Sequence, residues 1–93
     1  MAVVTQVMTF AGISQEFDIG TFTEFAYKLT PTQEAYVQTE RSLDGGATWT
    51  VIGEHIVKFE ITVFKPDEQP NSRYRVRFFG GVGSLKVEMT NEP

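Results

Sequence analysis

The sequence contains no cysteine, only four prolines and a single histidine, His55. Without cysteine, a disulfide framework, a thiol nucleophile and a thiolate metal site are all excluded. Its apolar runs are a few residues long, far short of the about 20 residues that span a bilayer, so we expect no membrane-spanning segment. The first residues lack the basic and apolar regions of a secretory signal. We therefore expect a protein that stays inside the cell that makes it, or leaves it in an assembled particle.

Basic residues are also few. Eight Lys and Arg against twelve Asp and Glu give a net charge of −4. Nucleic-acid binding needs basic clusters that neutralise phosphates, so we expect no nucleic acid as a partner. A chain of 93 residues has room for one domain, and we expect residues 1–93 to form it. A chain this short without disulfides is held together by packing or by assembly.

Apolar and polar residues alternate with a period of two along most of the chain, which is typical of half-buried antiparallel strands. Seven or eight short strands at fairly even spacing predict an all-β fold, an antiparallel two-sheet β-sandwich. Apart from an ambiguous central stretch, the predicted strands cover residues 3–10, 14–19, 25–29, 47–53, 57–63, 73–78 and 85–89.

Residues 30–43 have two interpretations. A capping signal around Pro31 is compatible with a helix, but residues 34–43 show no continuous apolar stripe. As a strand, this stretch turns Val37 inward and Glu40 outward. We favour the strand, because the hairpin that follows needs it.

That hairpin, residues 42–49, is the strongest local signal in the chain. Asp44 can bond nearby backbone N–H groups, and the two glycines after it adopt positive φ without a Cβ penalty. The spacing Ser-x-Asp-x-Gly-x-Thr-Trp resembles the Asp-box of sialidase-type β-propellers, a structural hairpin repeated once per blade. One copy does not make a propeller. We predict a tight hairpin stapled by Asp44 and Trp49, with Trp49 covering the core.

Two segments resemble fibronectin type III and related immunoglobulin-like domains. Residues 35–52 are similar to the central hairpin of that fold, and residues 74–87 to its last hairpin. The resemblance implies that Tyr74 is the corner tyrosine at the start of the penultimate strand. The core tryptophan that such domains carry on the second strand is missing, since this chain has Phe25 or Tyr27 there. The resemblance concerns fold more than function.

The candidate catalytic and metal-binding residues do not have the spacing that catalysis or metal binding needs. His55 and its neighbour Glu54 point to opposite faces of a strand, so we predict a surface histidine. Asp67 and Glu68 form an acidic pair in a proline-bounded loop, which we interpret as solvated, with a weak calcium site as the alternative. Glycine-rich residues 80–84 predict a β-turn rather than a phosphate loop. We expect no enzyme activity, no catalytic residue, no metal and no cofactor.

Two sets of outward side chains are candidates for binding a protein partner. Three alternating arginines lie on one face of one strand, which suits docking on an acidic protein surface. Cross-strand pairing with acidic residues such as Glu34, Glu40 or Glu60 is the interpretation that we favour for these charges, with docking as the alternative. Exposed aromatics often mark protein contacts, and those with outward parity are Phe22, Tyr36, Phe64 and Phe79. The predicted partner-binding residues are Phe22, Tyr36, Arg73, Arg75, Arg77 and Phe79.

Small, cysteine-free domains of this kind are similar to the immunoglobulin-like accessory proteins of tailed-phage particles, including capsid decoration and cement proteins. The resemblance implies a structural protein of the virion surface, made in the host cytoplasm. Its partner would be a capsid or tail lattice or a further copy of itself, with no membrane involved. The alternative is a small carbohydrate-binding module, in which Trp49 and Tyr36 stack on sugars and Asp44 or Asp67 anchors them.

Overall fold

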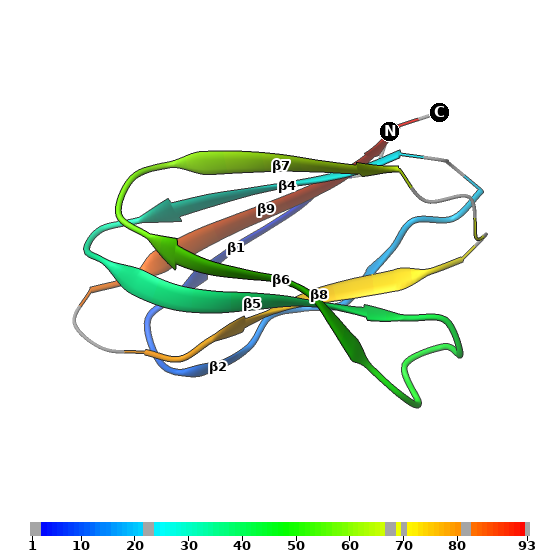
Figure 1. The fold of residues 1–93 in the computed structure, drawn as a ribbon, viewed down its shortest axis with the longest axis horizontal. Helices are drawn as coiled ribbons and strands as arrows, with labels where there is room; N and C mark the ends of the chain where they lie inside the picture. Colours follow the sequence, from blue (N-terminus) through cyan, green and yellow to red (C-terminus); the bar gives the residue numbers. More distant parts are fainter. Residues whose placement is uncertain (1–2, 22–23, 67–68, 70, 81–82, 93) are drawn as a thin grey trace.

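The computed structural model describes residues 3–21, 24–66, 69, 71–80 and 83–92, and every regular element in these ranges is a β-strand. The strands form two stacked antiparallel sheets, which confirms the predicted β-sandwich (Figure 1). They are β1 (Val3–Met8), β2 (Gly12–Ile13), β3 (Phe17–Asp18), β4 (Glu24–Pro31), β5 (Ala35–Ser42), β6 (Thr50–Val57), β7 (Ile61–Pro66), β8 (Arg73–Phe78) and β9 (Leu85–Glu92).

The first sheet has the strand order β1-β9-β4-β7, and the second has β2-β8-β5-β6, with β3 also paired to β8. Consecutive strands mostly lie in different sheets, so the chain crosses repeatedly from one layer to the other. This two-sheet order is a jelly roll, built from interlocked Greek keys. It makes neighbours of distant segments: β1 pairs with β9 from Val3 opposite Thr90 to Met8 opposite Leu85.

The order of the last strands corrects one expectation. Residues 74–87 do not form a hairpin, because β8 pairs with β5 in the second sheet while β9 pairs with β1 and β4 in the first. The central hairpin of β5 and β6 does form, and the segment 34–43 is a strand rather than a helix. The resemblance to fibronectin type III therefore extends to the two layers and the central hairpin, and not to the strand order.

The core lies between the sheets, and alternate residues of both fill it as the period of two predicts. Burying each large apolar side chain stabilises the fold by about 2 kcal/mol. Phe25 of the first sheet stacks on Tyr74 of the second, with ring centroids 3.7 Å apart and an interplanar angle of 10°, and this contact joins the two layers. The inward residues of the central strands are Phe25, Tyr27, Leu29, Val37, Tyr74, Val76, Phe78, Leu85, Val87 and Met89.

The single strand predicted over residues 57–63 is wrong. β6 ends at Val57 in the second sheet, and β7 begins at Ile61 in the first. Val57 is buried, whereas Phe59, which the alternation turned inward with it, is 82 % exposed in the connection. A period of two continues through this connection in the sequence, but the chain leaves one sheet and enters the other there.

Other strand boundaries also differ from the prediction, and β4, β6 and β9 extend beyond the predicted ends at residues 29, 53 and 89. The first strand ends at Met8, and the return strand of the hairpin begins only at Thr50. The strand predicted over residues 14–19 is replaced by the two short strands β2 and β3. Between them, Ser14 donates its N–H to the Val76 carbonyl at 2.8 Å, while the Ser14 hydroxyl accepts the Val76 N–H at 2.9 Å. A side chain thus replaces one backbone bond, which interrupts the ladder.

Candidate functional site

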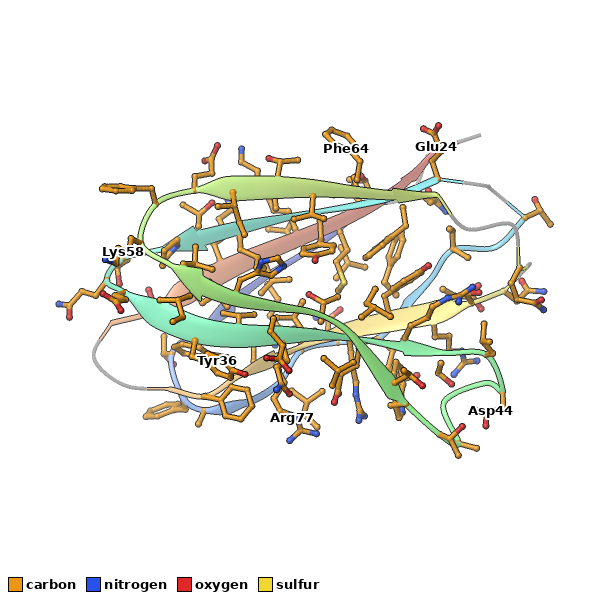
Figure 2. All side chains as sticks on the ribbon, in the orientation of Figure 1. Glu24, Tyr36, Asp44, Lys58, Phe64 and Arg77 are labelled. Atoms are coloured by element: carbon orange, nitrogen blue, oxygen red, sulfur yellow. The ribbon has the colours of Figure 1, made fainter. Side chains whose placement is uncertain are left out.

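The candidate site is the outer face of the second sheet, where the outward residues of β8, β5 and β6 lie together. Figure 2 shows Tyr36 and Arg77 pointing away from the first sheet, and Phe64 on the opposite side of the molecule. Of the four predicted outward aromatics, Tyr36 and Phe79 therefore belong to this face and are in ring contact. Phe64 belongs to the outer face of the first sheet. Phe22 lies outside the described residues.

An exposed apolar row crosses this face and consists of Phe79, Tyr36 and Ile56. Tyr36 lies opposite Ile56 in the strand register, and the Phe79 N–H donates to the Tyr36 carbonyl at 3.3 Å. The rings of Tyr36 and Phe79 meet at a centroid distance of 4.8 Å and an angle of 60°. The three residues are 47 %, 37 % and 66 % exposed. A contiguous exposed row of this kind is typical of a protein contact site.

Polar contacts hold the Tyr36 side chain in place. Its hydroxyl donates to a carboxylate oxygen of Glu54 at 3.1 Å. The Gln38 amide donates to the Tyr36 hydroxyl oxygen at 3.2 Å and lies 3.5 Å from the other Glu54 oxygen. Because the ring is oriented in the free protein, less side-chain entropy is lost when a partner covers it.

Arg75 and Glu40 form a mostly buried ion pair on the same face. Arg75 Nε donates to Glu40 Oε1 at 2.7 Å, and Arg77 Nε lies 3.6 Å from Glu40 Oε2. The side chains of Arg75 and Glu40 are 18 % and 9 % exposed. Glu40 points outward as predicted, yet it is buried because the arginines cover it. The trio of Arg75, Glu40 and Arg77 carries one net positive charge.

The third arginine is also compensated within the chain. Arg73 Nη1 lies 3.2 Å from Glu16 Oε1, and Arg73 Nε lies 3.9 Å from Asp18 Oδ2. Cross-strand pairing of the arginines, the favoured interpretation, is thus confirmed for Glu40. The other two acidic residues that were predicted to pair with the arginines lie beside lysines instead. Glu34 lies beside Lys58, and Glu60 lies beside Lys28.

The hairpin between β5 and β6 has the stapled geometry that its sequence predicts. Asp44 Oδ1 accepts the Ser42 hydroxyl at 2.8 Å and the Thr48 N–H at 2.9 Å, and Asp44 Oδ2 accepts the Thr48 hydroxyl. These bonds, the Thr48 hydroxyl first, lower the pKa of Asp44 from 3.8 to about 2. Gly46 adopts φ 97°, and its carbonyl accepts the Trp49 indole N–H at 3.0 Å.

Trp49 does not cover the core. Its indole is half-buried and lies 4.0 Å from the Arg75 guanidinium on the outer face. The cause is a β-bulge: Thr39 pairs with Gly53, but Glu40 pairs with Val51. Because β6 has one extra residue at the bulge, the side chains that precede the bulge point to the opposite face from the one that strict alternation gives. Trp49 therefore points outward.

The remaining candidates for catalysis or metal binding are His55 and the acidic pair Asp67 and Glu68. His55 is half-buried rather than a surface residue, and its Nε2 lies 2.9 Å from the Tyr27 hydroxyl. Within the described residues, no three acidic or histidine side chains are grouped to hold a metal ion. Asp67 and Glu68 lie outside those residues, so the calcium alternative stays a prediction. No helix in the described ranges is long and apolar enough to cross a bilayer.

Sequence reasoning missed Ile56, a member of the apolar row, and Ile13, which is 42 % exposed opposite Arg77. Ile56 fell between two predicted strands, residues 47–53 and 57–63, so it was assigned no face. The alternation of Glu54 and Ile56 with inward neighbours was a usable signal, but only the register with β5 brings Ile56 beside Tyr36.

No family model matches the chain, and no curated protein matches it in sequence. Solved structures do share its fold. The SPBc2 prophage-derived protein YomS is similar with a TM-score of 0.69 at 12 % identity, over 96 % of this chain and 93 % of that one. The pre-peptidase C-terminal domain of a collagenase from Bacillus anthracis is similar with a TM-score of 0.60 at 6 % identity, over 98 % and 88 %. TmCBM61 in complex with β-1,4-galactotriose is similar with a TM-score of 0.55 at 12 % identity, over 97 % and 70 %. At these identities the likeness concerns the β-sandwich fold.

Proposed function

We propose that this chain is a non-enzymatic structural protein that docks on a larger assembly through the outer face of its second sheet. The observation that carries the proposal is the apolar row of Phe79, Tyr36 and Ile56, exposed beside charges that are largely paired. Protein interfaces typically have aromatic residues at their buried centre and polar residues around them. The apolar row would form that centre, with Arg77 and Glu54 beside it.

We further propose that the assembly is a bacteriophage virion and that the chain is a capsid decoration or cement protein. Two facts support this: one structural neighbour comes from a prophage, and jelly rolls are common among viral capsid proteins. Both are analogies of fold. The mechanism would be burial of the apolar row, with the net positive charge near Arg77 set against an acidic group of the lattice. Weak identical contacts repeated by symmetry add up through avidity.

Sedimentation of a native lysate from the source, followed by immunodetection, tests the location. The chain is expected in a megadalton particle fraction, and a chain found wholly with small soluble proteins contradicts the virion proposal. The purified chain with the substitution Phe79→Ser is then added to particles that lack the chain, and its docking is measured. We expect it to lose docking, while Phe59→Ser, a matched change of an exposed phenylalanine outside the face, docks like wild type. Equal docking by both variants contradicts the proposed face.

The alternative is a small carbohydrate-binding module. A structural neighbour solved with a galactotriose and the exposed, oriented ring of Tyr36 favour it. Two of the other predicted contributors are engaged within the chain: Trp49 packs on Arg75, and Asp44 bonds Ser42 and Thr48. Asp67 lies outside the described residues. Titration of the chain with β-1,4-galactotriose tests this function. Binding that Tyr36→Ala removes without unfolding the domain would support it over docking on a protein lattice.

A further inference from the structure

The outer face of the first sheet is a surface that the proposed function leaves unused. Buried and outward residues alternate on β4 and β9, and the register lines up the outward ones in rows across the four strands. Figure 2 shows Phe64 of one such row pointing away from the sandwich. One row has apolar residues at its two edges and consists of Val3, Thr90, Ala26 and Phe64. The next row, called the charged row, has two charges at its centre and consists of Thr5, Glu88, Lys28 and Thr62.

Apolar side chains lie at both edges of this face, Lys28 and Glu88 lie at its centre, and Glu24 lies opposite Glu92 in the register at one end. Val3 on β1 is 54 % exposed and Phe64 on β7 is 75 % exposed. A shallow depression of about 190 Å³ lies over β4 beside Phe64, and Lys28 and Glu88 also line it. Lys28 and Glu88 face each other directly in the register of β4 and β9.

We propose that this face binds a second copy of the chain, first sheet against first sheet, about a two-fold axis parallel to the strands between β9 and β4. This rotation sets β9 against β4 of the second copy, and β1 against its β7. Lys28 then meets Glu88 of the other copy, and Val3 meets its Phe64. By symmetry each of these contacts occurs twice. Two twisted sheets pack in this way with their strands within about 30° of each other.

The charge pattern selects this arrangement over the other face-to-face one. A two-fold axis perpendicular to the strands, along the charged row, would set each strand on itself. Lys28 would then meet Lys28 and Glu88 would meet Glu88, and like charges in contact suppress a complex. Of these two axes, only the one parallel to the strands makes both Lys28–Glu88 contacts attractive, although it also sets Glu24 opposite Glu92 of the other copy at one end of the face, which weakens the dimer.

Lys28 and Glu88 are loosely paired within their own chain. Lys28 Nζ lies 3.4 Å from Glu60 Oε2, and Lys86 Nζ lies 3.5 Å from Glu88 Oε1. Exposed pairs of this kind contribute little and are easily exchanged. Four strands about 4.8 Å apart and about 20 Å long give a footprint of about 400 Å² per copy, at the low end for protein interfaces. The dimer is therefore weak, and it presents two second-sheet faces outward, which makes docking bivalent.

Sedimentation equilibrium of the purified chain, from micromolar to millimolar concentration, tests the proposal. Wild type is expected to show a monomer–dimer equilibrium. Lys28→Glu makes the centre of the face wholly acidic and Glu88→Lys makes it wholly basic, so each variant alone should dissociate about tenfold more readily or worse. A mixture of the two should form heterodimers, and the double variant K28E/E88K should dimerise like wild type. Lys58→Glu, the same charge change in the connection between β6 and β7, is the matched control and should not alter dimerisation.

A wild-type chain that stays monomeric at millimolar concentration overturns the proposal. So does a Lys28→Glu variant that dimerises as well as Lys58→Glu, or a mixture that stays monomeric although circular dichroism shows both variants folded. The result is separable from the proposed docking, which uses the opposite face. Phe79→Ser should leave the monomer–dimer equilibrium unchanged, and Lys28→Glu monomers should retain docking at single-site strength.

Discussion

The outer faces of the two sheets differ in where their charged and their apolar side chains lie. On the second sheet the central charges, Arg75 and Glu40, form a mostly buried pair, and Tyr36 and Phe79 are exposed further along the same face. On the first sheet the central charges, Lys28 and Glu88, are half-buried, and exposed apolar side chains lie at the edges. Both sheets obey the same alternation. The character of a face therefore depends on which strands become neighbours.

The largest expected effect comes from breaking the buried pair on the second sheet. Arg75→Ala leaves Glu40 mostly buried with only Arg77 beside it at 3.6 Å, and it removes the packing of Trp49. Leaving a buried charge without its close partner costs about 3 kcal/mol, which should lower the thermal midpoint by roughly 10 °C or more in a domain of this size. Thermal unfolding followed by circular dichroism measures the shift.

Arg77→Ala is the matched control for that experiment, because Arg77 is twice as exposed as Arg75, 37 % against 18 %. Its free energy of unfolding should change by less than about 1 kcal/mol. Equal destabilisation by the two variants would mean that the two arginines share the role assigned to Arg75.

A smaller effect is expected at the hairpin that extends the second sheet. The pKa of Asp44 lies at about 2 in the folded chain, below its ordinary 3.8. The carboxylate therefore stabilises the fold above about pH 4, and this contribution is lost as the pH falls toward about 2. Asp44→Asn should be less stable than wild type at neutral pH, and the difference should shrink as the pH falls through this window. Urea unfolding at a series of pH values measures it, and a difference that is constant with pH would contradict the assignment.

The smallest effect is expected from Tyr36→Phe, which keeps the ring of the apolar row but removes its bond to Glu54. Because the group is exposed, the free energy of unfolding should change by about 0.5 kcal/mol or less. Docking should weaken only a few-fold, since apolar contact area is retained while orientation is lost. Tyr36→Ala, by contrast, should abolish docking. A Tyr36→Phe variant as defective as Tyr36→Ala would assign the interaction to the hydroxyl rather than the ring.

Much of the second-sheet face was predictable, because its signals are local. The alternation in residues 73–78 put the three arginines outward and Tyr74, Val76 and Phe78 inward, as observed. The stapled hairpin also followed from its own eight residues. By contrast, the bulge that turns Trp49 outward and the register that brings Ile56 beside Tyr36 arise between strands. A pattern read along one strand contains no information about them.

The sequence by itself determined an all-β sandwich, the inward side chains of most strands and the geometry around Asp44. These follow from a period of two and from bonds between residues a few positions apart. The tertiary structure alone decided that β8 and β9 lie in different sheets, that residues 57–63 divide between two layers, and that Glu40 is buried beneath Arg75 and Arg77. Each of these depends on pairing between segments far apart in the chain. Such pairing is selected by the packing of the whole core, and local alternation is compatible with several strand orders.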